Sequence, residues 1–126
     1  ALPIFKKDIE SILHPLIFTE CIKFIEDHKK AKYVVVVIPL LFESKNFLGL
    51  INESLLIDCH IENQISRVKI RDNLGKDLIL SIINSQMSRS HKQTKADKII
   101  LNDSSESELE KKIISFHNYL IKKIND

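Results

Sequence analysis

The chain has 126 residues, of which 44% are hydrophobic and 29% charged, and its net charge is +2. This length suits one globular domain with a core of its own. The longest apolar run, residues 33–42, is too short to cross a bilayer and contains Pro39. The two glycines, Gly49 and Gly75, stand too far apart to form a nucleotide phosphate loop. Composition therefore argues against a membrane protein and against a phosphate loop within these residues.

The first residues, the cysteines and the charge indicate a cytoplasmic protein. The segment ALPIFKKDIE has its charges in the wrong order for a secretory signal. Cys21 and Cys59 have no metal-ligand spacing, and we expect both to be reduced thiols. Residues 64–98 carry eight basic and three acidic side chains, but the chain as a whole is near neutral. We therefore expect no nucleic acid and no membrane as partner.

The first half of the chain predicts two helices and a strand. Apolar residues recur at helical spacing from Ile9, but proline disrupts a helix interior, so we expect one helix to end near Leu13 and another to begin at Pro15. The β-branched run YVVVVIPLL, residues 33–41, is typical of a strand buried on both faces in a parallel sheet.

The second half alternates strands and helices. ESLLIDC, residues 53–59, predicts a strand, and the helix after it breaks at residues 72–75. A further helix begins near Leu78, KIIL at residues 98–101 predicts a third strand, and Ser105 with Glu108 predicts a capping box for the last helix. This alternation is typical of an α/β fold with a parallel sheet.

Four segments in this order carry a family resemblance: HPLI, VVVVIPLLFE, QISRVKIRD and NSQMSR…KADKIILND. From about Ile9 to Asn102, the chain resembles the later part of dephospho-CoA kinases, which are P-loop kinases. The resemblance implies transfer of the γ-phosphoryl group of ATP to the ribose 3′-hydroxyl of dephospho-CoA, with magnesium. It also implies a three-layer P-loop kinase-like parallel sheet with flanking helices and a helical lid.

The resemblance places these residues as one partial domain, 1–126. Residues 1–32 match the acceptor-side helices, and residues 64–96 match the lid. The family's central strand, phosphate loop and most of its magnesium site lie upstream of every segment that matches here. We therefore expect these residues to be part of a longer polypeptide and to be inactive by themselves.

The three arginines, Arg67, Arg71 and Arg89, all fall in the lid-like segment. Arg67 and Arg71 stand one helical turn apart, and a guanidinium group can bind phosphate oxygens with two donors at once. The resemblance implies that both are catalytic, although a surface pair, for instance between Arg71 and Asp72, is the alternative. Arg89, with Gln86, matches the family's Q-x-x-R and is expected to bind substrate.

Four other residues are candidates by the same resemblance. His14 and Pro15 are expected to bind the acceptor substrate, with helix capping as the alternative for His14. Glu43, after the first strand, is expected to bind substrate or to be a loop carboxylate. Asn102 is expected beside the adenine of ATP, or in a turn. The remaining histidines are expected at the surface without convergent partners; these are His28, His60, His91 and His117.

Two other functions remain open on sequence grounds. The basic segment suits a non-catalytic module that binds nucleotide or RNA phosphates. Another nucleotide kinase, acting on nucleoside monophosphates, shares the same order of strands, helices and lid.

Overall fold

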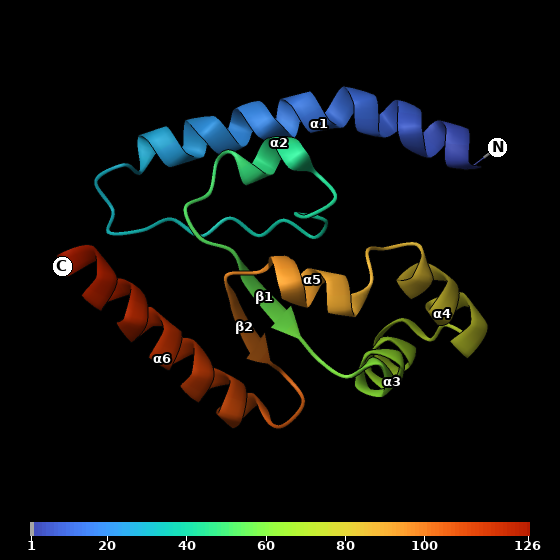
Figure 1. The fold of residues 1–126 in the computed structure, drawn as a ribbon. Helices are drawn as coiled ribbons and strands as arrows, with labels where there is room; N and C mark the ends of the chain where they lie inside the picture. Colours follow the sequence, from blue (N-terminus) through green and yellow to red (C-terminus); the bar gives the residue numbers. More distant parts are fainter. Residues whose placement is uncertain (1) are drawn as a thin grey trace. The chain divides into compact units, whose positions relative to one another are not determined.

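The computed structural model describes the backbone of residues 2–126 and the side chains of residues 8–126. Its contacts divide the chain into two compact units, Ala1–Leu50 and Ile51–Asp126. Figure 1 shows the first unit in blue to teal and the second in green to red. The first side chains of the predicted acceptor-side segment 1–32 lie outside the described residues.

The first unit begins with one long helix, α1 (Leu2–Asp27), which continues through Pro15. The predicted break into two helices is therefore wrong. Proline removes a single backbone donor, and the side chains around it are exposed, so water can reach the backbone carbonyl left without that donor. One turn further on, the Thr19 hydroxyl donates to the Pro15 carbonyl over 2.9 Å. Apolar residues recur at helical spacing on both sides of the proline, and the helix continues without a break.

The run after α1 is irregular, so the strand predicted for residues 33–41 is wrong for this structure. Within residues 2–126, no other segment pairs with it. A β-branched run becomes a strand only when a neighbour accepts its backbone hydrogen bonds. Val35 and Val37 are 68% and 86% exposed, although burial on both faces was expected.

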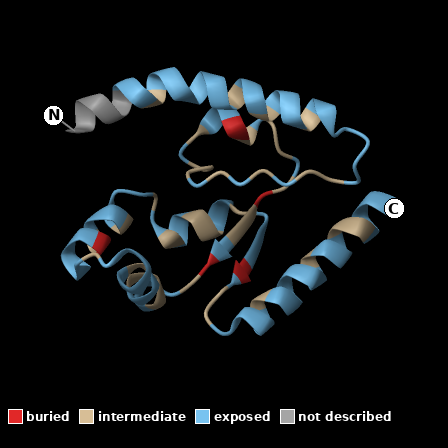
Figure 2. Cartoon of the chain, turned by 180° about the vertical axis from the view of Figure 1, so that it is seen from behind, coloured by how far each residue is buried: buried red, intermediate tan, exposed pale blue. Residues whose placement is uncertain are grey.

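The short helix α2 (Lys45–Leu48) supplies the core of this unit. Phe47 on α2 is buried, and its ring meets the ring of Phe18 on α1 edge-on at 5.5 Å. A groove of about 500 Å³ lies between α1 and the irregular run; its lining includes Leu16, Ile17, Phe24 and residues 35–37. This unit therefore leaves much apolar surface uncovered, and Figure 2 shows most of α1 in the colour of exposed residues.

The second unit is built on two parallel strands, β1 (Leu55–Asp58) and β2 (Lys98–Leu101). Their register pairs Leu55 with Lys98 and Asp58 with Leu101. Just before the strands, the Asp97 carboxylate accepts hydrogen bonds from the backbone and hydroxyl of Ser54, at 2.7 and 3.0 Å, and the Ser54 hydroxyl accepts one from the Asp97 backbone. This reciprocal pair fixes both strand starts at the same level, so both strands also end together.

The second unit has four helices: α3 (Ile61–Asp72), α4 (Lys76–Asn84), α5 (Arg89–Lys95) and α6 (Glu106–Asn125). α3 and α4 pack against each other. α3 ends at Asn73 in the left-handed conformation, and α6 begins at Ser105, whose hydroxyl accepts from the Glu108 backbone, as the capping box predicts. α5, which the sequence analysis did not predict, contacts β1, and α6 contacts β2. The second unit is therefore an α/β fold with a small parallel sheet and flanking helices, as expected at this level.

Within residues 2–126, no helix combines the length and the apolar character that crossing a bilayer requires.

Candidate functional site

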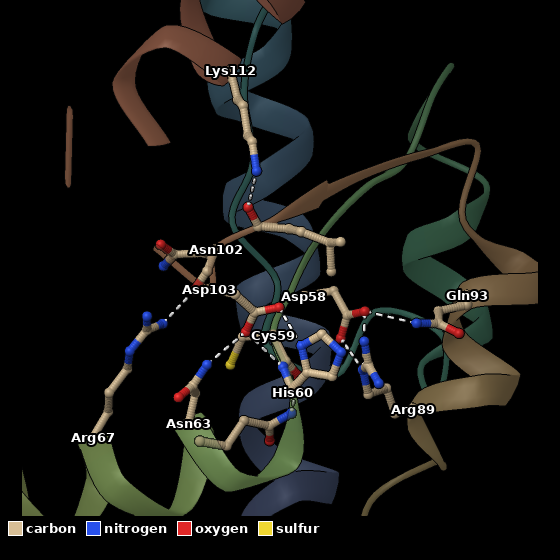
Figure 3. A network of polar contacts seen from close by, with 12 residues as sticks. Asp58, Cys59, His60, Asn63, Arg67, Arg89, Gln93, Asn102, Asp103 and Lys112 are labelled. Atoms are coloured by element: carbon tan, nitrogen blue, oxygen red, sulfur yellow. Dashed lines mark hydrogen bonds and ion pairs between the residues drawn. The ribbon is translucent and has the colours of Figure 1, made fainter. Parts of the chain in front are cut away.

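Polar side chains gather where β1 and β2 end (Figure 3). Asp58 is the last residue of β1, and Asn102 and Asp103 follow β2 directly. The Asn102 backbone donates to the Asp58 carbonyl over 2.7 Å, which keeps the two strand ends side by side. The carboxyl edge of a parallel sheet is where α/β proteins bind their ligands. We therefore take this cluster as the candidate site.

Asp58 is buried and bound to two side chains of α5. Arg89 Nε lies 2.8 and 3.0 Å from its two carboxylate oxygens, and Gln93 Nε2 lies 2.7 Å from one of them. Burial acts to raise the pKa of Asp58, but the hydrogen bonds from Arg89 and Gln93 outweigh it and leave the pKa below its usual value. The hydrogen bond with Asp58 in turn raises the pKa of Arg89. Asp58 is thus a charged anchor and not a proton acceptor.

Asp103 joins the loop after β2 to the start of α3. Its carboxylate accepts hydrogen bonds from Asn63 Nδ2 at 3.0 Å, from the His60 backbone at 2.8 Å and from His60 Nδ1. Because the Asn63 and His60 donors favour the charged form, the pKa of Asp103 falls to about 2. The prediction that His60 has no convergent partner is wrong, because Asp103 is remote in sequence and only the strand register brings it near.

Two of the predicted site residues, Arg67 and Asn102, come together here. Arg67 on α3 donates from Nη1 to the backbone carbonyl of Asn102. The contact spans the gap between the helix after β1 and the loop after β2. A guanidinium group and an asparagine therefore line the same part of the carboxyl edge.

Arg71, one turn after Arg67, instead pairs with its neighbour Asp72. Its Nε and Nη2 atoms lie 2.8 and 2.7 Å from the two oxygens of that carboxylate. The hydrogen bonds with Asp72 raise the pKa of Arg71, whose side chain is 73% exposed. This is the surface pair that the sequence left open as the alternative, and the catalytic role of Arg71 stays a prediction.

Cys59 follows Asp58 in the chain and is half-buried. Burial raises the pKa of its thiol, with Asp103 acting in the same direction and Arg67 against it. A raised pKa keeps the thiol protonated near neutral pH, so Cys59 is a poor nucleophile.

The predicted substrate-binding residues His14, Pro15 and Glu43 belong to the first unit. His14 and Pro15 are exposed on α1, and Glu43 is exposed in the turn before α2. The side chain of Arg89, the fourth residue predicted to bind substrate, lies in the second unit beside Asp58. The roles of these four residues stay predictions.

Sequence reasoning missed Asp58, Gln93 and the His60–Asp103 pair. One available signal was a charged residue closing an otherwise apolar strand, as in LLID. Another was the spacing of Arg89 and Gln93, which places both side chains on one helix face. The His60–Asp103 pair had no such signal, because it depends on the register of two strands.

No three His, Cys, Asp or Glu side chains gather as metal ligands among the described residues. Asp58, the carboxylate best placed at the carboxyl edge, already accepts hydrogen bonds from Arg89 and Gln93. The described residues therefore do not fit a metal centre of their own.

The family model described as Dephospho-CoA kinase matches residues 3–108. A dephospho-CoA kinase of Chromobacterium violaceum is 35% identical over 121 residues, covering 96% of this chain and 59% of that protein. One of Neisseria meningitidis serogroup B is 37% identical over 119 residues, covering 94% and 57%. The crystal structure of TT1252 from Thermus thermophilus superposes with a TM-score of 0.72 at 27% identity, covering 94% of this chain and 61% of that one.

The chain thus spans less than two thirds of the length of these relatives. The family model nevertheless covers most of the chain, including α3, α4, α5 and both strands. The chain belongs to the dephospho-CoA kinase family.

Proposed function

We propose that the protein, at its full encoded length, phosphorylates the ribose 3′-hydroxyl of dephospho-CoA with ATP, the last step of coenzyme A synthesis. The observation that carries this proposal is the match of the dephospho-CoA kinase model to residues 3–108. Phosphoryl transfer of this kind depends on positioning the reactants and on neutralising negative charge on the phosphates.

In the proposed site, the carboxyl edge of β1 and β2 binds ATP. Arg67 and Arg89 supply guanidinium donors to the phosphates, and Asn102 lies beside the adenine. The contact between Arg67 and Asn102, and the position of Arg89 at the end of β1, support this assignment. Arg71 also binds a phosphate group, and to do so it gives up its ion pair with Asp72. That pair is exposed and joins two neighbours in the chain, so little stability is lost.

The first unit takes the acceptor side in this proposal. His14, Pro15 and Glu43 contact dephospho-CoA, and residues 64–96 close over the phosphates as a lid. Residues 33–41 form a further strand of a three-layer P-loop kinase-like sheet in the complete fold. Their β-branched sequence and the exposure of Val35 and Val37 support that assignment. We also propose a cytoplasmic location.

Magnesium, when bound, offsets negative charge on the transferring phosphoryl group. Because the described residues form no metal centre of their own, the arginines are the charge-neutralising groups that this chain contributes.

The direct test is an acceptor-specific kinase assay on the protein at its full encoded length. With ATP and magnesium, we expect dephospho-CoA to be converted to coenzyme A, and nucleoside monophosphates to remain unphosphorylated. Preference for a nucleoside monophosphate would indicate another nucleotide kinase. No turnover with any acceptor, together with salt-sensitive and sequence-indifferent RNA binding, would favour a non-catalytic phosphate-binding module.

A further inference from the structure

Asp58 stands out because charged side chains are seldom buried without a reason. It is 5% exposed, and no other charged residue among those described is buried to this extent. A buried ion pair is by itself weak evidence for stability, because taking two charges out of water offsets much of their attraction. The geometry of its partners shows what else it does.

Arg89 meets Asp58 through Nε, the guanidinium nitrogen nearest the chain. Arginine usually pairs with a carboxylate through two nitrogens at once, as Arg71 does with Asp72. In the part of the chain that the structure describes, neither terminal nitrogen of Arg89 donates a hydrogen bond. About a third of the side chain, 35%, is exposed, whereas that of Asp58 is 4% exposed. Nε of Arg89 is therefore bound to the buried carboxylate, whereas its two terminal nitrogens can donate hydrogen bonds to another acceptor.

Gln93 completes the arrangement. It lies one turn after Arg89 on α5, and both side chains bind the same carboxylate. Asp58 therefore fixes the orientation of α5 as well as that of Arg89. Its own backbone carbonyl accepts from Asn102, so the same residue ties α5 to the end of β2.

We propose that Asp58 is a positioning residue that holds Arg89 by Nε so that its two terminal nitrogens face a phosphate group of ATP. This inference rests on the proposed kinase function. A planar guanidinium can bind a carboxylate along one edge and a phosphate along another, whereas a lysine ammonium is a single point charge. Fixing the donors before the phosphate arrives lowers the cost of ordering them during transfer.

The test compares Asp58→Asn and Arg89→Lys with the wild type, at full encoded length, in the dephospho-CoA kinase assay. Asp58→Asn keeps the shape of the side chain and removes its charge, and Arg89→Lys keeps a charge but removes the separate nitrogens. We expect each variant to lower kcat roughly 10²-fold, the size typical for loss of one transition-state donor. KM for dephospho-CoA should change less than about twofold, because the acceptor site is untouched. Glu110→Gln, at an exposed glutamate on α6 outside the lid segment, removes a charge in the same way; it is the matched control and should keep wild-type kcat.

The double variant separates positioning from a general loss of structure. If Asp58 acts through Arg89, the double variant should be no slower than Arg89→Lys alone, whereas independent effects would multiply. Wild-type kcat in Asp58→Asn or in Arg89→Lys would overturn the inference and leave the kinase function standing. If Asp58→Asn does not fold, Arg89→Lys decides alone.

If the wild type proves inactive on dephospho-CoA, the proposed function fails first. The same variants are then compared for ATP affinity by calorimetry. A loss of about fivefold or more in both variants would support the positioning role, whereas unchanged affinity, or no ATP binding by the wild type, would overturn it.

Discussion

Arg67 and Arg71 show how the same residue type, one helical turn apart, finds different partners. Arg67 reaches across to the loop after β2, whereas Arg71 pairs with the adjacent Asp72 on the exposed side of α3. Exposed ion pairs contribute little to stability, so the Asp72 pair does not prevent Arg71 from binding a stronger anion. The sequence identified both arginines, but only the structure shows that Arg67 already lies at the carboxyl edge.

Replacing Arg67 with alanine should lower kcat/KM for ATP roughly 10²-fold, because a charge-assisted donor at the phosphates is lost. Steady-state kinetics of the full-length protein check this. Lys69→Ala, an exposed lysine on the same helix, is the control and should stay within about twofold of wild type. Equal effects of the two variants would mean that α3 supplies only general positive charge.

The lowered pKa of Asp103 leads us to expect that the stability of the protein depends on pH. Its pKa in the folded protein is about 2, below the usual 3.8, so the stabilisation is present above pH 3.8 and is lost as the pH falls through about 2. Urea unfolding of the wild type and of Asp103→Asn should therefore give curves that differ at pH 5 and converge near pH 2. Asn63→Ala should reduce the difference in part. A constant difference from pH 5 to pH 2 would contradict the role of the ionised carboxylate.

At the level of elements, local sequence signals predicted most of the second unit. The turn residues after α3 and the Ser105 cap at the start of α6 depend on neighbours in the chain, and both were confirmed. α5 was not predicted because its polar sequence, RSHKQTK, has no apolar residues at helical spacing. Its position depends instead on the hydrogen bonds that Arg89 and Gln93 donate to Asp58. The strand predicted for residues 33–41 does not form in this structure, because a strand requires a partner that local sequence does not provide.

Pro15 gives a test at this level. Replacing it with alanine restores a backbone donor in the interior of α1 and should stabilise that helix by up to about 3 kcal/mol. Hydrogen exchange should then slow for the amides of α1 on both sides of the site. Glu20→Ala, exposed on the same helix, should change protection little. Faster exchange around residue 15 would show that the proline favours the observed helix.

The whole molecule combines a second unit with a formed sheet and a first unit with much uncovered apolar surface. Only Phe47, Ile79 and Ile100 are buried hydrophobic residues among those described. An apolar, β-branched run that joins no sheet in the described residues and has exposed valines favours association between copies. The sequence predicted the apolar character of residues 33–41, and the structure adds that the alternate residues Val35 and Val37 face solvent.

Changing Val37 to lysine should therefore raise the solubility of the 126-residue chain when it is expressed by itself. Light scattering against protein concentration is the measurement, and we expect the onset of association to move to higher concentration. Ser66→Lys, which adds the same charge at an exposed position on α3, is the control. An equal gain from both variants would show that net charge, and not the valine run, governs association.

The assignment of the carboxyl edge of β1 and β2 to the nucleotide is tested most directly by an NMR titration of the full-length protein with ATP. We expect the largest shifts at the guanidinium groups of Arg67 and Arg89 and at the backbone amides of residues 102 and 103. Dephospho-CoA should instead shift residues of the first unit, including His14. ATP-induced shifts confined to other parts of the protein, or no shifts at saturating ATP, would contradict the assignment.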